Sequence, residues 1–337
     1  MQKMAPIKRI GMSFTVLVTA ATLAKPGMDL LAQVGARVIY LSDPNSVEEV
    51  ERLMATEPVD AVISRTVQLT AKAMESCPTL KVISKHGVGV SNIAVEAATR
   101  RGIPVYVTPG ANAQSVAELT LGLMFAAARR IGWMDRELHE GRWSRAQDGV
   151  ELNGKTLGLI GFGQVGRRVA AVCQTLGMEV AAYDPALIDG VSPLPGVRIL
   201  SSLDELLSSS QVVSLHVPLN KHTRNMLGAA QFAAMPQGAI LVNTARGEVV
   251  DESALIAALK SGHLYAAGLD TMAIEPLPLG SVLASLPNVV LTPHVGGSTP
   301  AALAGMASGA ARNVLSFLQG TPVEISACVN PQVLSTP

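Results

Sequence analysis

Three residues far apart in the chain have side chains suited to acid–base chemistry on an anionic substrate. Arg246, Glu275 and His294 each follow a short apolar run with the length of a buried strand. Imidazole can accept and release a proton near neutral pH, and a guanidinium can bind a carboxylate through two parallel hydrogen bonds. Taken singly, each residue has an ordinary explanation as a strand end, a surface ion pair or a solvated turn. Together they form a candidate catalytic unit.

A second motif is the glycine-rich sequence GFGQVG between a predicted strand, 156–160, and a predicted helix, 164–176, which Gly177 ends. Its first glycine permits a tight turn, its second allows a pyrophosphate to approach the backbone, and its third allows the helix to pack on the strand. The amides and dipole of the helix N-terminus favour phosphate groups. The residues expected to bind a dinucleotide here are Gly161, Gly163, Gln164, Val165 and Gly166.

The next predicted strand, 180–183, ends at Asp184, which lies 18 residues after Gly166. An acidic residue about 20 residues beyond the turn can bond the adenosine ribose, and it repels a 2′-phosphate. No Arg or Lys occurs within 185–197. The sequence therefore favours NAD over NADP as the cofactor.

The elements that must position these residues form two series of short apolar runs, separated by segments of helical length. This alternation predicts parallel sheets that are covered on both faces. The runs of the first series are 14–19, 38–41, 61–64, 82–85 and 105–107, and those of the second are 156–160, 180–183, 212–216, 239–243, 267–270 and 289–291. Two sheets imply two domains.

The domain boundary is expected at Thr108-Pro109-Gly110, before a long helical stretch predicted over 115–140. A final helix is predicted over 300–318, and the tail beyond it is expected to return to the first domain. The predicted domains are thus a substrate-binding domain of residues 1–110 and 300–337, and an NAD-binding domain of residues 111–299 that includes dimerisation helices.

Composition excludes several other classes of protein. The 337 residues include 26 Lys and Arg and 26 Asp and Glu, so a balanced net charge argues against nucleic acid or an anionic membrane as partner. Three cysteines, far apart and in no CxxC motif, argue against disulfides and a metal site. Lys3, Lys8 and Arg9 before an uncharged run imitate a signal peptide, but a buried strand from Phe14 explains that run better. A cytoplasmic protein is expected.

With these motifs the chain resembles the D-isomer-specific 2-hydroxyacid dehydrogenase family. In motif it is closest to the phosphoglycerate dehydrogenase and hydroxypyruvate reductase members of that family. The resemblance covers nearly the whole length. Besides the glycine turn, the matching segments are 85–92 (KHGVGVSN), 112–118 (NAQSVAE), 151–158 (ELNGKTLG), 216–219 (HVPL), 243–247 (NTARG), Asp270, Glu275-Pro276 and Pro293-His294.

The resemblance implies a Rossmann cofactor domain inserted into a flavodoxin-like substrate domain, an active site in the cleft between them, and a homodimer formed through the helical stretch. It implies hydride transfer between NAD(H) and a D-2-hydroxy acid or 2-keto acid. His294 would be the acid/base, Glu275 would bond its far nitrogen, and Arg246 would bind the substrate carboxylate. Further cofactor contacts are expected from His216, Pro218, Thr244 and Asp270.

The predicted substrate contacts lie in the first domain and just before the second sheet. Amides around Val88 and Gly89 are expected to bind the substrate carboxylate. Lys85 and Arg65, which close two neighbouring strands, and Arg145, which would reach over from the other subunit, lie where phosphoglycerate dehydrogenases carry basic residues toward a phosphate. This suggests a second anionic group, phosphate or sulfonate, although Lys85 stands where an Arg is usual and solvated surface charge explains the others nearly as well. The candidate substrate residues are Arg65, Lys85, Val88, Gly89, Asn112 and Arg145.

Two other functions fit the same motifs. Transcriptional corepressors that sense NAD(H) share this fold and triad, but they carry partner-binding extensions, of which this sequence has almost none. A family member that oxidises an inorganic acid such as phosphite would keep the cofactor and change the substrate. Turnover assays separate these alternatives from a 2-hydroxyacid dehydrogenase.

Overall fold

The computed structural model describes residues 14–145, 148–187 and 190–334. The chain divides into two compact units, one formed by Met1–Asn112 with Pro300–Pro337 and the other by Ala113–Thr299. The basic residues Lys3, Lys8 and Arg9 lie outside the described part. No helix within that part is long and apolar enough to cross a membrane.

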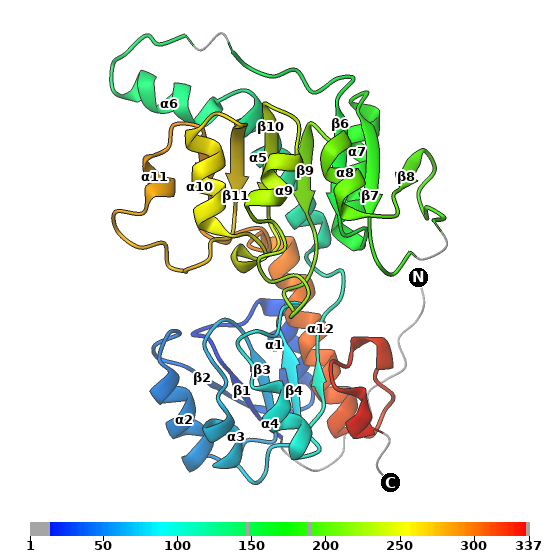
Figure 1. Cartoon of the computed structure of the whole chain (residues 1–337). Helices are drawn as coiled ribbons and strands as arrows, with labels where there is room; N and C mark the ends of the chain where they lie inside the picture. Colours follow the sequence, from blue (N-terminus) through cyan, green and yellow to red (C-terminus); the bar gives the residue numbers. More distant parts are fainter. Residues whose placement is uncertain (1–13, 146–147, 188–189, 335–337) are drawn as a thin grey trace. The chain divides into compact units, whose positions relative to one another are not determined.

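The first unit is built on a five-stranded sheet in which all neighbouring strands are parallel (Figure 1). The strand order is β2-β1-β3-β4-β5, which is the flavodoxin-like order. The strands are β1 (Thr15–Val18), β2 (Arg37–Tyr40), β3 (Ala61–Ser64), β4 (Val82–Lys85) and β5 (Val105–Tyr106).

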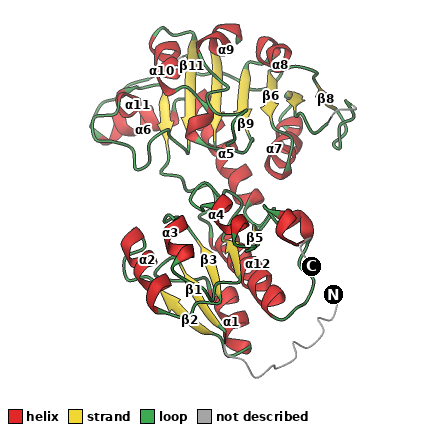
Figure 2. Ribbon diagram, turned by 60° about the horizontal axis from the view of Figure 1, so that its bottom comes forward, coloured by secondary structure: helices red, strands yellow, loops and turns green. Residues whose placement is uncertain are grey.

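Helices cover both faces of this sheet (Figure 2), because alternate residues of its strands are apolar on both sides. Leu17 packs toward one core, and its neighbours Val16 and Val18 pack toward the other. The tail after the last helix bonds this unit through Asn330, whose side-chain oxygen accepts from the Val105 amide. The helices are α1 (Lys25–Gln33), α2 (Val47–Thr56), α3 (Ala71–Glu75), α4 (Val95–Arg100) and α12 (Pro300–Leu318).

The second unit is built on a seven-stranded parallel sheet with the order β12-β11-β10-β9-β6-β7-β8. Its first six strands along the chain follow the Rossmann order, and the strand order reverses between β6 and β9. The predicted fold class, two doubly wound parallel-sheet domains, is therefore confirmed. The strands are β6 (Thr156–Ile160), β7 (Glu179–Tyr183), β8 (Val197–Ile199), β9 (Val212–Leu215), β10 (Ala239–Asn243), β11 (Leu264–Leu269) and β12 (Val289–Leu291).

The helices of this unit also form two layers, and the helical stretch predicted over 115–140 is divided between two of them. The division falls at Arg130, which adopts a left-handed conformation with φ of 52°. Arg130 forms an ion pair with Asp148 and stacks on Trp133, so contacts outside the helix fix the break. The helices are α5 (Ala113–Ala128), α6 (Ile131–His139), α7 (Gln164–Thr175), α8 (Leu203–Ser209), α9 (Ala229–Ala234), α10 (Glu252–Lys260) and α11 (Val282–Ser285).

Candidate active site

The candidate catalytic residues follow three adjacent strands of the seven-stranded sheet. Strands β10, β11 and β12 are neighbours and parallel, so their carboxyl ends lie at one edge of the sheet. Arg246 follows β10, Glu275 follows β11 and His294 follows β12. The fold thus gathers at one edge three residues that are up to 48 positions apart in the sequence.

His294 and Glu275 are in direct contact. The Nδ1 atom of His294 lies 2.7 Å from Oε2 of Glu275, and the two side chains are 45% and 34% exposed. The Met272 amide donates to the other carboxylate oxygen at 3.0 Å. Because Nδ1 is bonded to the carboxylate, Nε2 is the ring nitrogen that can exchange a proton with a substrate.

Charge and hydrogen bonding keep Glu275 ionised. Partial burial alone would raise its pKa, but the hydrogen bond and charge of His294, the Met272 amide and the Arg246 charge together lower the pKa below its ordinary value. A carboxylate at this position stabilises an imidazolium at His294. The imidazole of this pair can therefore accept the proton that a substrate hydroxyl loses.

Hydrogen bonds to Asp270 fix the loop that carries His294. The buried Asp270 carboxylate accepts hydrogen bonds from the Thr292 hydroxyl at 2.6 Å and from the amides of Val295 and Gly296 at 2.8 Å each. Its backbone carbonyl accepts from the His294 amide at 2.8 Å. These bonds hold His294 in a left-handed conformation with φ of 55°, which costs about 1–3 kcal/mol in a residue other than glycine.

A tight turn after β10 presents Arg246. The Asn243 side chain accepts from the Ala245 amide and donates to the Arg246 carbonyl, both at 2.9 Å, and so closes the turn. Burial lowers the pKa of the Arg246 guanidinium, while the charges of Glu275 and Glu248 act in the opposite direction. A guanidinium with so high an ordinary pKa remains charged, so Arg246 can bind a carboxylate at this edge.

Glycine is required at position 247 for this arrangement. A Cβ atom there would lie 1.9 Å from the Met272 carbonyl carbon, inside the backbone of the segment that leads to Glu275. The loops bearing Arg246 and Glu275 can touch only because residue 247 has no side chain. Asn243 and Gly247 were not predicted as site residues, although an Asn three positions before Arg246 is a recognisable turn signal.

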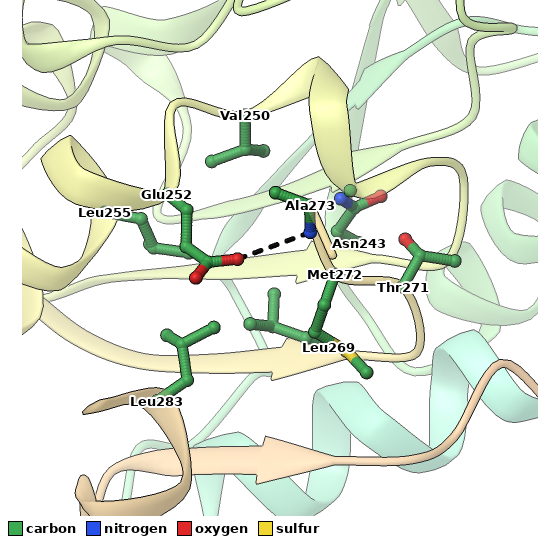
Figure 3. Close-up of a pocket in the computed structure, with 10 residues that line it drawn as sticks. Asn243, Val250, Glu252, Leu255, Leu269, Thr271, Met272, Ala273 and Leu283 are labelled. Carbon is green, nitrogen blue, oxygen red and sulfur yellow. Dashed lines mark hydrogen bonds between the residues drawn. The ribbon is translucent and has the colours of Figure 1, made fainter. Parts of the chain in front are cut away.

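A small pocket lies behind the segment 271–273, among residues of β10, β11 and α10 (Figure 3). Oε2 of Glu252 accepts from the Ala273 amide at 3.3 Å, the bond drawn as a dashed line in Figure 3. The Thr271 hydroxyl in this pocket is buried and has no hydrogen-bond partner among the described residues. Glu252 thus supports the segment that leads to Glu275.

The glycine turn fits a bound dinucleotide. Gly161 has a φ of 93°, and a Cβ there would lie 2.5 Å from the His216 carbonyl oxygen. A Cβ on Gly166 would lie 2.6 Å from the Gly161 carbonyl oxygen, so the third glycine permits close packing of α7. A Cβ on Gly163 would meet no described atom within 4 Å. Helix α7 begins after Gly163 without a side-chain cap among the described residues, which leaves the amides of its first turn for phosphate oxygens.

Asp184 lies beside this turn, because Ile160 at the end of β6 pairs with Tyr183 at the end of β7. Its carboxylate accepts from the Phe162 amide at 2.8 Å and from the Ala186 amide at 2.9 Å. Each oxygen keeps a further lone pair that can accept from a ribose hydroxyl. Free amides at the first turn of α7 and a carboxylate at Asp184 are the groups expected at an NAD site.

The remaining predicted cofactor residues have internal contacts. The His216 ring lies beside Gly166 and bonds the Ser214 hydroxyl at 3.0 Å, and burial lowers its pKa to about 4, so it is neutral. The Thr244 hydroxyl bonds that of Thr120 at 2.8 Å. Pro218 is exposed, and its carbonyl accepts from the Thr223 hydroxyl at 2.7 Å.

The predicted substrate residues fall in both units. Lys85 and Arg65 end neighbouring strands of the first unit, and the Lys85 ammonium donates to the Arg65 carbonyl and the Asn92 side-chain oxygen. In the same unit Val88 is half exposed, while Gly89 and Asn112 are partly buried. Arg145 belongs to the second unit, where it is exposed and lies over the Trp143 ring at 5.9 Å.

Comparison with known proteins identifies the second unit. The family model described as "D-isomer specific 2-hydroxyacid dehydrogenase, NAD binding domain" matches residues 121–296, more than half of the chain. The prediction of NAD as the cofactor is thereby confirmed. Among the residues described above, this match spans the glycine turn, Asp184 and all three candidate catalytic residues.

Similarity to individual proteins extends over both units. The chain is 38% identical over 308 residues to D-3-phosphoglycerate dehydrogenase of Archaeoglobus fulgidus, covering 91% of this chain and 58% of that protein, so it spans little more than half of that relative. It is 46% identical over 257 residues to hydroxypyruvate reductase of Thermotoga maritima, covering 74% of this chain and 82% of that protein. The crystal structure of the TT0316 protein from Thermus thermophilus superposes with a TM-score of 0.84 at 38% identity, covering 94% of this chain and all of that one.

Proposed function

Because the chain belongs to the D-isomer-specific 2-hydroxyacid dehydrogenase family, we propose that it transfers hydride between NAD(H) and a small D-2-hydroxy acid or 2-keto acid. The observation that supports this most strongly is the contact of the His294 ring with Glu275, on strand ends adjacent to that of Arg246. A base and a carboxylate-binding cation are the two groups that this reaction needs from the protein.

When bound at the glycine turn, NAD would supply the acceptor for the hydride that leaves C2 of the hydroxy acid in the proposed oxidation. Nε2 of His294 accepts the hydroxyl proton, and Glu275 at Nδ1 stabilises the imidazolium that forms. Arg246 binds the substrate carboxylate, which orients C2 and polarises the adjacent carbon–oxygen bond. In the reduction of a keto acid, His294 returns the proton to the new hydroxyl.

The second unit is proposed to bind the cofactor and the first to bind the substrate. The first unit supplies amides around Val88 and Gly89 for a carboxylate, as well as the cations at the ends of β3 and β4. A substrate with a second anionic or polar group, of the 3-phosphoglycerate or hydroxypyruvate type, agrees with those cations. Phosphoglycerate dehydrogenase and hydroxypyruvate reductase are also the names of the two relatives described above.

A homodimer is proposed to form through α5 and α6. These helices expose the apolar side chains of Phe125, Ile131 and Leu138, and Trp143 beyond them is 77% exposed. Apolar groups of this size favour burial against a second chain. Light scattering after size exclusion would test this proposal, with Leu138→Asp expected to shift a dimer toward monomer.

The activity is tested by a panel of 2-keto acids with NADH, in which phosphorylated, sulfonated and plain three-carbon compounds are compared. We expect NADH oxidation with at least one of them, and oxidation of only the D enantiomer of the corresponding hydroxy acid. NADPH is expected to be a poor substitute, because Asp184 would repel its 2′-phosphate. If NADH binds and no keto acid is reduced, the proposed activity is wrong.

A further inference from the structure

The carboxyl ends of β3 and β4 in the first unit hold a cluster of three basic residues, of which His86 has no part in the proposed function. Ser64 pairs with Lys85 in the parallel register of these strands, so Arg65 and His86 occupy the next pair of positions. The His86 amide donates to the Ser64 carbonyl at 2.9 Å, which keeps the two segments together beyond the strand ends. Arg65 and His86 are therefore neighbours.

Lys85 has an internal task at this edge. Its buried ammonium donates to the Arg65 carbonyl and to Oδ1 of Asn92. The Asn92 amide nitrogen in turn donates to the Ser64 hydroxyl at 3.1 Å, and to the carbonyls of Arg65 and Val67 at 3.0 and 2.8 Å. Lys85 and Asn92 thus fix the backbone that presents Arg65, and an ammonium committed to these acceptors has less capacity for a ligand.

Unlike the Lys85 ammonium, the Arg65 guanidinium donates no hydrogen bond of this kind to a described residue. Its guanidinium is half buried, and burial is the one influence that lowers its pKa. Within residues 14–145, 148–187 and 190–334, no carboxylate forms an ion pair with it. A partly desolvated cation without a counter-ion favours binding of an anion.

His86 is the third member of the cluster. It is 8% exposed, and it is hydrogen-bonded to the Leu303 backbone of α12. Burial first, and then the charges of Arg65 and Lys85, lower its pKa to about 4, so the ring is neutral at physiological pH. The charged groups that act on this ring from the described elements are these two cations, and both disfavour its protonation.

We propose that Arg65 and His86 together bind a second anionic group of the substrate, and that His86 takes up one proton from solvent as this group binds. The inference rests on the proposed function. An anion placed between Arg65 and His86 offsets the repulsion that keeps the ring neutral, and it accepts a hydrogen bond from the imidazolium. His86 is thereby a specificity-determining residue that favours substrates with a second negative charge.

The test compares two keto acids across pH. Sulfopyruvate carries a sulfonate whose charge is constant across the neutral range, and hydroxypyruvate has a neutral hydroxyl at the same carbon. The two substrates share the reacting carbon and the carboxylate, so the ratio of their kcat/KM values isolates the second group. We expect the ratio to rise in favour of sulfopyruvate as the pH falls, approaching about tenfold per pH unit.

The variant His86→Gln keeps a hydrogen-bonding side chain but cannot become charged, so its ratio should not change with pH. His86→Asn provides a second variant if the first folds poorly, and His139→Gln, on the exposed end of α6, is the control for loss of an imidazole. A wild-type ratio independent of pH, or the same pH dependence in the His86 variants, would overturn the inference. Hydroxypyruvate turnover without any sulfopyruvate turnover would do the same.

A binding measurement keeps this inference separate from the proposed activity. In NMR titrations of the imidazole signals, the His86 signal is the one missing from His86→Gln. At mildly acidic pH it should report a neutral ring in the free protein and a protonated ring with saturating sulfopyruvate, without NAD or turnover. Protonation in a protein that reduces no keto acid would refute the activity alone, and a ring that stays neutral would refute the role of His86.

Discussion

The two sheets of this chain each gather basic side chains at their carboxyl edge, but among the described residues only the seven-stranded sheet pairs them there with acids. There, His294 bonds Glu275, and Arg246 lies within the influence of Glu275 and Glu248. At the edge of the five-stranded sheet, Arg65 has no acidic partner among the described residues, and His86 is neutral.

This difference separates two kinds of task. A base that must gain and lose a proton in each turnover needs a fixed carboxylate that stabilises its charged form. A site for a ligand's anion needs the opposite, since an internal carboxylate would compete with the ligand. The contact of His294 with Glu275 therefore agrees with proposed catalysis, and an Arg65 guanidinium with no ion pair to a described carboxylate agrees with proposed binding.

The largest effect is expected from His294→Ala, which removes the proposed base from the carboxyl edge of the seven-stranded sheet. Loss of general acid–base catalysis should lower kcat by about 10²-fold to 10⁴-fold. NADH affinity, measured by calorimetry, should stay close to that of the wild type because the glycine turn is unchanged. Near-normal turnover would exclude His294 from the mechanism.

A smaller loss is expected from Arg246→Lys, which keeps the charge but replaces the planar fork with a single ammonium. Hydrogen bonds to charged groups contribute about 1.5–3 kcal/mol, so kcat/KM should fall by about 10-fold to 100-fold. The exposed Arg312, changed to Lys, is the matched control and should be indistinguishable from the wild type. Equal activity of Lys at position 246 would mean that two-pronged binding of the carboxylate is not needed.

At the carboxyl edge of the five-stranded sheet, Lys85 and Arg65 should respond differently to the same substitution. Lys85→Met leaves the Arg65 carbonyl and the Asn92 oxygen without this donor, and it should lower the free energy of unfolding by about 1–3 kcal/mol. Arg65→Met breaks no ion pair with a described residue and should change it by less than about 0.5 kcal/mol. Urea unfolding measures both. An equal loss in the two variants would show that Arg65 also has a structural role.

Much of this organisation could be predicted from the sequence because its signals are local. The turn from Gly161 to Gly166 requires three glycines at fixed spacing, and the strands that precede Arg246 and His294 are continuous apolar runs bounded at 239–243 and 289–291. In a parallel sheet, strand ends share an edge, so the order of the elements along the chain suffices to bring these residues near one another.

Features that depend on contacts distant in sequence could not be predicted. The break between α5 and α6 depends on the pairing of Arg130 with Asp148, and no Pro marks it. The three-residue strand β8 at the sheet edge is too short to show a period. Lys85 was placed correctly at a strand end, but the direction of its ammonium depends on Asn92 and on the Arg65 carbonyl.

The smallest effect concerns acid stability at the paired edge, where Glu275→Gln removes the carboxylate whose pKa is lowered. A carboxyl group with a lowered pKa in the folded state stabilises the fold above its unfolded pKa, near 4.5, and loses this contribution as the pH falls through its folded value. Since the pair is partly exposed, the effect should stay below about 1 kcal/mol. The difference in unfolding free energy between wild type and variant should therefore shrink from about pH 6 to about pH 3.

The exposed Glu75, changed to Gln, is the control. A difference that is constant over this range would mean that the His294–Glu275 contact does not stabilise the fold through the charge of the carboxylate. The loop of His294 would then be stabilised by the hydrogen bonds of Asp270 instead.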